Sequence, residues 1–163
     1  MGTRVAVIAD THLPRGARVL PQECLDELAR ADLILHAGDV TAAPVLELLR
    51  GFAPVEAVHG NMDDPELVAT LPEHLVVEVA GSRIGMLHIP GPAAGRAERL
   101  ATRFRGCDAV VYGHTHVPEA RQHDGVWILN PGSPTERRRA PHRSLLRLEI
   151  VAGTITPALV TLP

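Results

Sequence analysis

Aromatic residues make up only 2 % of this 163-residue chain, and only two cysteines occur in it. So few rings exclude the base-stacking surface of a protein dedicated to single-stranded nucleic acids. Cys24 and Cys107 both lie beside apolar segments, and we interpret them as small buried hydrophobic residues. They do not make a disulfide framework, which indicates a reducing compartment.

The chain also lacks a strong charge of either sign and a long apolar run at its start. Its formal net charge is -3, which does not indicate a surface for nucleic acids or anionic membranes. The first apolar run, Val5–Ala9, is interrupted by Asp10 and is too short for a signal peptide or a membrane span. We therefore expect a cytoplasmic protein with no nucleic-acid or membrane partner.

Strands and helices alternate in the first part of the chain. Four short apolar runs have the pattern of strands covered on both faces, and we expect them to share one sheet: 4–9, 33–37, 55–58 and 109–112. Leucines at helical spacing predict helices over Pro21–Arg30 and Ala43–Leu49. This alternation is typical of parallel βαβ units in an α/β fold.

The second part of the chain has the pattern of hairpins. Leu75–Val79 and Arg83–His88 flank a short turn and predict an antiparallel pair of strands. A helix over about 93–104 and two further hairpins follow, with turns at Asp124-Gly125 and at Gly153. Because the chain has no repeats and no flexible linker, we expect one domain over residues 1–163.

Seven residues with metal-binding side chains share a position in this pattern. Each lies at or just after the C-terminal end of a predicted strand: Asp10, His12, Asp39, Asn61, His88, His114 and His116. In open α/β sheets, the crevice outside these strand ends is where ligands bind. Residues two apart in an extended segment face the same way, so Asp10 with His12, and His114 with His116, can each hold one ion.

The chemistry of these side chains limits the choice of metal. Imidazole, carboxylate and carboxamide groups without a thiolate favour Mn, Fe, Co, Ni or Zn ions over a closed structural zinc site. Seven ligands exceed the need of one ion, and a carboxylate such as Asp39 can bridge two. Two divalent cations leave a net positive charge beside these carboxylates. We therefore expect two metal ions and a small phosphate-ester substrate.

Other polar residues nearby have more ordinary explanations. A single histidine is more often hydrogen-bonded than metal-bound, and we interpret five in this way: His36, His59, His74, His123 and His142. His36 and His59 could still orient a ligand through a hydrogen bond, and so could Asp63 if it is not a surface carboxylate. We interpret the basic run Arg137–Arg139 as a solvated loop rather than a phosphate clamp.

Several short motifs follow one another in a distinctive order: Asp10-x-His12, Gly38-Asp39, Gly60-Asn61, His88, Gly113-His114-Thr115-His116 and Asn130-Pro131-Gly132-Ser133. Over almost the whole chain, this set resembles the calcineurin-like metallophosphoesterases. The short length, the segment Gly60–Asp64 and the Asn130–Ser133 motif are similar to the small YfcE-type phosphodiesterases. That branch is also similar to the retromer subunit Vps29.

The resemblance implies a four-layer α/β/β/α sandwich and two metal ions bridged by Asp39. One ion would be held by Asp10, His12, Asp39 and His116, and the other by Asp39, Asn61, His88 and His114. Asn61 would also contact the substrate, and Asp63 would support the catalytic groups. The implied activity is hydrolysis of small phosphodiesters, with manganese as the expected metal and in-line attack by a hydroxide that bridges the two ions.

Two positions depart from the family's pattern. Met62 stands where many members have a histidine that is thought to protonate the leaving group, so we expect a preference for good leaving groups. Ile89 and Pro90 replace the Gly-His that commonly follows the residue at His88, so the loop or pocket there is expected to differ. Met62 favours the alternative, a Vps29-like protein-binding scaffold with little or no catalysis. The sequence leaves the oligomeric state open, a homo-oligomer included.

Overall fold

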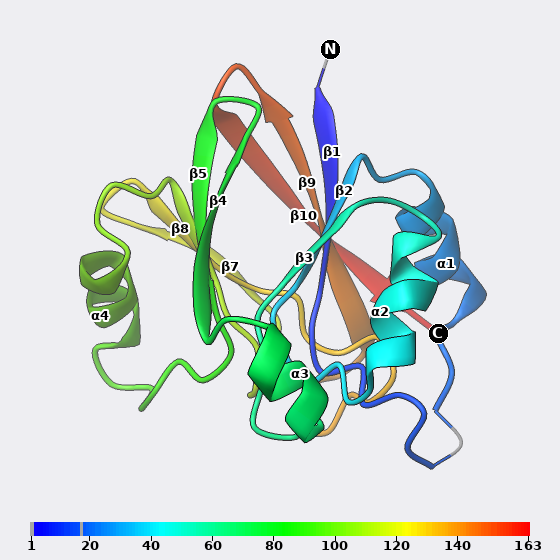
Figure 1. Cartoon of the computed structure of the whole chain (residues 1–163). Coiled ribbons are helices and arrows are strands. Elements are labelled where there is room, and N and C mark those ends of the chain that lie inside the picture. The colour runs from blue at the N-terminus through cyan, green and yellow to red at the C-terminus, as the bar shows by residue number, and fades with distance from the viewer. Residues whose placement is uncertain (1, 17) are drawn as a thin grey trace.

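Two five-stranded β-sheets lie face to face in the computed structural model, which describes residues 2–16 and 18–163 (Figure 1). The first sheet has the order β10-β9-β1-β2-β3 and contains β1 Thr3–Ile8, β2 Leu33–His36, β3 Val55–Ala57, β9 Arg143–Val151 and β10 Thr154–Leu162. The second has the order β4-β5-β6-β8-β7 and contains β4 His74–Val79, β5 Ser82–Leu87, β6 Ala109–Val111, β7 Glu119–His123 and β8 Val126–Asn130.

Both sheets are mixed, and each has a parallel centre. In the first sheet β1, β2 and β3 run parallel, while β9 pairs antiparallel with β1. In the second sheet β5, β6 and β8 run parallel, and β4 and β7 are antiparallel edge strands. The carboxyl ends of parallel neighbours lie at the same edge of a sheet, so each sheet collects several loops at one end.

Helices cover the outer face of each sheet, which gives the four layers α/β/β/α (Figure 1). The helices α1 (Gln22–Ala29), α2 (Ala43–Arg50) and α3 (Pro65–Thr70) bury Leu28, Leu46 and Leu67 in one cluster with strand residues of the first sheet. On the other side, α4 (Arg96–Arg103) packs against the second sheet. The predicted sandwich is therefore confirmed.

Three apolar clusters hold these layers together. The cluster between the sheets joins residues of β1, such as Val5 and Val7, to Ile84 and Met86 of β5. The other two lie between each sheet and its helices. Because both faces of the central strands are buried, their sequences are continuously apolar rather than alternating.

The structure differs from the sequence-based expectation in three places. The run 109–112 forms β6 of the second sheet, between β5 and β8, and does not join the other three runs in one sheet. The helix expected over 93–104 begins only at Arg96, because Gly95 adopts a left-handed backbone with φ 67°. The short helix α3 was not predicted, since six residues are too few to show a helical period.

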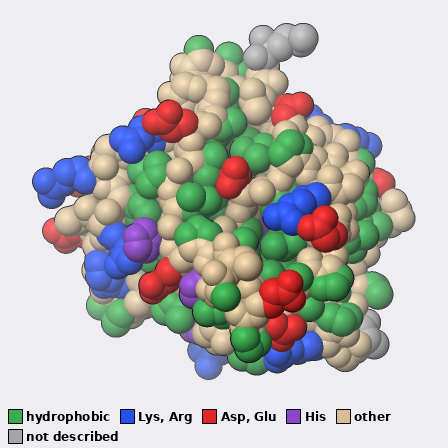
Figure 2. Space-filling model, in the orientation of Figure 1, with side chains coloured by type: hydrophobic (Ala, Val, Ile, Leu, Met, Phe, Trp, Pro, Cys, Tyr) green, Lys and Arg blue, Asp and Glu red, His purple; other side chains and the backbone are tan. Residues whose placement is uncertain are grey.

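Charged side chains of both signs are interspersed on the face of the molecule seen in Figure 2, in keeping with the formal net charge of -3. Attraction of an anionic substrate therefore depends on the local charge of its site. Within residues 2–16 and 18–163, no helix has the length and apolar character needed to cross a bilayer.

Candidate metal centre

Loops from both sheets meet at the candidate site. The N–H of Asp10 donates to the carbonyl oxygen of Gly38 at 2.9 Å, which ties the loop after β1 to the loop after β2. The N–H of His114 donates to Asp10 Oδ2 at 2.9 Å and so ties in the loop after β6 of the second sheet. All seven predicted ligands lie on loops that follow strand ends, as the sequence indicated.

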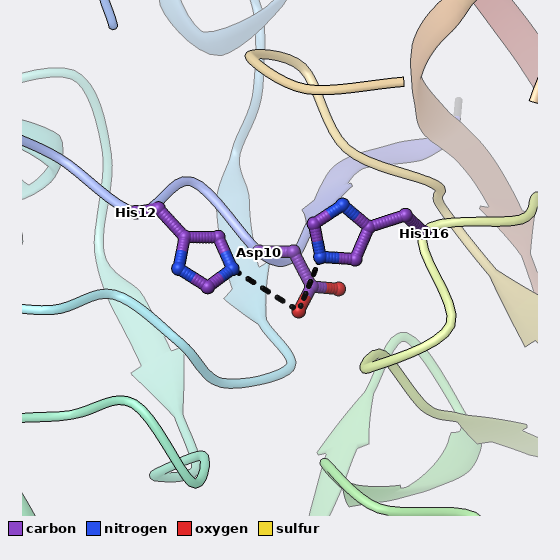
Figure 3. A group of neighbouring side chains, drawn as sticks. All are labelled: Asp10, His12 and His116. Carbon is purple, nitrogen blue, oxygen red and sulfur yellow. Dashed lines mark ion pairs between the residues drawn. The ribbon is translucent and has the colours of Figure 1, made fainter. Parts of the chain in front are cut away.

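Asp10, His12 and His116 form one group of potential metal ligands (Figure 3). Asp10 Oδ1 lies 3.4 Å from Nε2 of His116 and 3.8 Å from Nε2 of His12. All three side chains are buried. Both rings therefore turn a nitrogen toward the same carboxylate oxygen, an arrangement that can hold one cation.

A second group of potential ligands consists of Asp10, Asp39 and His88. His88 Nε2 lies 3.2 Å from Asp39 Oδ2 and 3.7 Å from Asp10 Oδ1. Asp39 Oδ2 also lies 3.5 Å from His12 Nε2. Asp10 thus belongs to both groups, while Asp39 reaches a histidine of each, as a bridging carboxylate would.

Asn61 and His114 complete the second group on its solvent side. Asn61 Oδ1 lies 3.0 Å from His88 Nε2 and 3.1 Å from His114 Nδ1. Both residues are exposed, whereas Asp39 and His88 are buried. The structure therefore brings all seven predicted residues together, with the carboxylates innermost and Asn61 and His114 facing solvent.

Two buried polar atoms of the site lack a hydrogen-bond partner among the described residues. They are Asp10 Oδ1 and His12 Nε2. An unsatisfied polar atom inside a protein costs free energy, and a carboxylate oxygen more than most. A divalent cation between these atoms would remove that cost, so the residues present fit a metal site.

The two carboxylates of the centre are held in the charged form that a metal requires, and without a metal their charge also favours a proton on His88. Burial alone would raise the pKa of Asp10, but contacts with His116 and His12 and the charge of His88 outweigh it, so this pKa lies below its usual value. Burial would likewise raise the pKa of Asp39, but the hydrogen bond and the charge of His88 lower it. Burial opposes the charged form of His88, yet Asp39 and Asp10 raise its pKa. Both carboxylates are therefore ionised at neutral pH.

Hydrogen bonds to the backbone fix which nitrogen of two histidines faces the centre. His88 Nδ1 donates to the carbonyl oxygen of Ala37 at 2.7 Å, and His116 Nδ1 donates to that of Glu136 at 3.1 Å. When Nδ1 carries the proton, Nε2 of a neutral ring is left with a lone pair. Both Nε2 atoms are thus available to a metal.

The backbone at the ligands is strained. Five of them have a positive φ: Asp10 55°, His12 48°, Asp39 57°, His114 73° and His116 61°. This left-handed region is uncommon for residues other than glycine, and its persistence in a fold is typical of functional sites.

Asp63 ties the loop of Asp39 to the loop of Asn61. Its carboxylate accepts hydrogen bonds from the N–H groups of Asp39 at 3.2 Å, Thr41 at 2.6 Å and Gly60 at 2.6 Å. The side chain therefore positions the loops that carry ligands.

The Asn130–Ser133 motif supports the site from beneath. Ser133 Oγ donates to the carbonyl oxygen of Asp10 at 2.8 Å, and Asn130 Nδ2 donates to Thr115 Oγ1 at 3.0 Å. His36 acts similarly: its Nδ1 accepts from the N–H of Gly38, and its Nε2 contacts Thr11 Oγ1 at 3.0 Å. His36 is thus a hydrogen-bonded residue outside the ligand groups.

The two departures from the family's pattern are visible in the structure. The side chain of Met62 is 39 % exposed, and its N–H donates to Asp39 Oδ1 at 2.8 Å. Ile89 is 53 % exposed. Arg99 holds the loop after it by donating to the carbonyl oxygens of Pro90 at 3.0 Å and Pro92 at 2.7 Å. His88 keeps its place in the ligand group although the following residues differ.

A cavity of about 170 Å³ adjoins the centre, and Asn61 and His88 are among its lining residues. It is also lined by Glu73 and Arg103, which were not identified from the sequence. Glu73 comes just before a strand, and Arg103 is the last residue of α4. Charged residues at such positions are usually solvated, so no sequence pattern marks them.

This fold and the arrangement of its Asp, His and Asn side chains define the class of metal-dependent phosphoesterases. The family described as "Calcineurin-like phosphoesterase superfamily domain" matches residues 3–153. The chain belongs to this family.

Individual proteins similar to this chain agree with the family. A probable metallophosphoesterase of Methanothermobacter thermautotrophicus is 37 % identical over 150 residues, which cover 89 % of this chain and 86 % of the relative. A probable metallophosphoesterase of Methanocaldococcus jannaschii is 38 % identical over 149 residues, covering 90 % of this chain and 75 % of that relative. Among solved structures, wild-type Vps29 of Entamoeba histolytica complexed with Zn²⁺ has a TM-score of 0.77 and 27 % identity, and the match covers 98 % of this chain and 99 % of the other.

Proposed function

We propose that this protein hydrolyses small phosphodiesters with two divalent metal ions bound at the candidate centre. The observation that carries the proposal is the buried, unsatisfied Asp10 Oδ1, which faces three histidine nitrogens at 3.4 to 3.8 Å. A structural carboxylate would be hydrogen-bonded in such a place, because burial without a partner is costly. A metal-binding carboxylate needs its lone pairs free.

Each ion has its own set of residues in this proposal. One is held by Asp10, His12, Asp39 and His116, and the other by Asp39, Asn61, His88 and His114. The distances of Asp39 Oδ2 to His12 and His88, 3.5 and 3.2 Å, support its place between the two sets. Nitrogen and oxygen ligands without thiolate suit manganese, and equally Fe, Co, Ni or Zn. The relative solved with Zn²⁺ supports a divalent cation.

The metal ions, when bound, lower the pKa of a water molecule and neutralise charge on the phosphoryl oxygens, which favours in-line attack. The chain's own residues hold and orient the reactants. Asn61 lies at the solvent side of the centre, where its carboxamide can contact a phosphoryl oxygen. Met62, next to it, cannot donate a proton to a leaving group. We therefore expect faster hydrolysis of esters whose leaving group departs without protonation.

The test compares two variants in which asparagine replaces an aspartate of left-handed backbone, a conformation that asparagine tolerates. Asp39 has φ 57° and Asp124 has φ 49°. With Mn²⁺ and bis(p-nitrophenyl) phosphate, Asp39→Asn is expected to lower kcat/KM at least about 100-fold, because it removes a negative ligand shared by both ions. Asp124→Asn, in a surface turn, should match the wild type. Equal rates for the two variants and the wild type would refute the proposal.

A second candidate function is a protein-binding scaffold of the Vps29 kind. The structural similarity to Vps29 over 98 % of the chain and the methionine at position 62 favour it. A scaffold does not require stoichiometric metal or hydrolysis. The diester assay above separates the two functions, because a Vps29 structure was itself solved with Zn²⁺ and bound metal alone does not decide between them.

A further inference from the structure

The cavity beside the centre has a wall that the proposed hydrolysis does not explain. Its lining includes Asn61 and His88, both proposed metal ligands, and also Glu73, Arg103 and Ile89. A substituent joined to phosphorus by one ester oxygen and directed to this side would enter the cavity. The lining residues therefore bear on which ester groups the site accepts.

The volume of the cavity shows what size of group it accommodates. The cavity measures about 170 Å³, and a cavity of about 150 Å³ is known to hold one benzene ring. It therefore fits a single five- or six-membered ring. Leu87 and Ile89 provide apolar contact for the face of such a ring.

The charged side chains of the lining limit the chemistry of the ester group that the cavity accepts. Glu73 and Arg103 both line the cavity, and among the ion pairs of the described residues neither takes part. The polar contact of Arg103 is a long one, 3.5 Å from Nη2 to His74 Nδ1. A carboxylate repels an anionic group and a guanidinium repels a cationic one, whereas a neutral hydroxyl can donate to the first and accept from the second.

We propose that this cavity selects a phosphodiester in which one ester group is a neutral, hydroxyl-bearing ring of the size of a single sugar. A hydroxyl of the ring donates to Glu73, and Arg103 donates to a ring hydroxyl oxygen. Leu87 and Ile89 pack against the carbon face. This inference rests on the proposed function and adds the substrate class to it.

The test uses two diesters that share p-nitrophenol as the leaving group. One carries methyl riboside, joined through O5, and the other carries cyclopentylmethanol, a ring of similar size without hydroxyls. The shared leaving group keeps the chemical step alike, so their ratio of kcat/KM reports on contacts with the ring. The wild type is expected to prefer the riboside about tenfold, since hydrogen bonds to charged groups are the stronger kind.

Two variants remove the polar lining and two serve as controls. Arg103→Leu and Glu73→Leu are each expected to reduce the preference to about twofold or less, with the cyclopentylmethyl diester hydrolysed within about twofold of the wild-type rate. Arg105 and Glu66 are exposed residues outside the cavity lining. Arg105→Leu and Glu66→Leu should therefore keep the wild-type preference.

A wild type without preference, or a preference that survives in both Arg103→Leu and Glu73→Leu, would overturn the subsite. Failure of the wild type to hydrolyse either diester would instead count against the proposed function. In that event calorimetry with methyl riboside 5-phosphate and cyclopentylmethyl phosphate decides the subsite on its own. Tighter binding of the riboside, lost in both variants, supports it, and equal affinities overturn it.

Discussion

At the scale of single residues, the proposed centre depends on which side-chain atoms have a hydrogen-bond partner and which are left available to a metal. Asp10 Oδ1 and His12 Nε2 are buried without a hydrogen bond. By contrast, Nδ1 of His88 donates a hydrogen bond to the carbonyl oxygen of Ala37. Residue types at strand ends could be recognised in the sequence. Their left-handed backbones and the choice of ring nitrogen could not, because both depend on contacts with distant loops.

His36 gives a residue-level prediction about pH. Burial lowers its pKa to about 3, against an ordinary 6.5. The unfolded chain therefore takes up the proton first, so this contribution to stability is complete above pH 6.5 and is lost as the pH falls toward 3. In the metal-free protein the free energy of unfolding should fall, through this group, by about 1.4 kcal/mol per pH unit between about pH 6 and 4.

Urea unfolding of wild type and His36→Gln in the presence of a chelator measures this slope. Gln cannot take up the proton, so the variant should be less stable at pH 7 but should lose stability less steeply as the pH falls. His142 is an exposed residue far along the chain, and His142→Gln is expected to keep the wild-type slope. An unchanged slope in His36→Gln would show that His36 is not the group responsible.

At the scale of elements, loops rather than strands carry the site, and they approach each other closely. A Cβ on Gly60 would lie 2.2 Å from Asp39 Oδ1, and a Cβ on Gly38 would lie 2.6 Å from His88 Nδ1. Glycine at these positions lets the loops after β2 and β3 meet the ligands of their neighbours.

Gly60→Ala is therefore expected to displace Asp39, both its side chain and its backbone nitrogen at 2.5 Å from the added Cβ, while leaving both sheets intact. Metal affinity and kcat/KM should each fall at least about tenfold, because a shift of about 1 Å at a ligand is enough to cost such a factor. Calorimetric metal titration and the diester assay measure the two effects. Gly51→Ala is the control, since Gly51 lies after α2 with φ -66° and its Cβ would meet no ligand. Wild-type metal affinity in Gly60→Ala would contradict this explanation.

Much of the element pattern could be predicted from the sequence, but the pairing of strands could not. The hairpins at Asp124-Gly125 and Gly153 are confirmed, because turn residues mark them locally. The run 109–112 was wrongly placed in the sheet of β1, since a strand buried on both faces has the same pattern in either sheet. The cavity wall at Glu73 and Arg103 was not predicted for a similar reason: the fold brings together the residue before β4 and the last residue of α4, and no motif marks them.

At the scale of the whole molecule, the face-to-face sheets bring together ligands that are up to 106 residues apart, from Asp10 to His116. The chain belongs to a family of phosphoesterases, and its fold is also that of Vps29. The fold therefore does not choose between hydrolysis and scaffolding. Two bound ions together with hydrolysis of the diester indicate the enzyme, because a Vps29 structure was itself solved with Zn²⁺.

The most direct measurement is the number of ions that the chain binds. After removal of metal with a chelator, wild-type protein is titrated with Mn²⁺ in a calorimeter, and bound metal is counted by elemental analysis after gel filtration. The account predicts two Mn²⁺ per chain for the wild type and a loss of at least one ion in Asp39→Asn. A wild-type stoichiometry of one or less would contradict it.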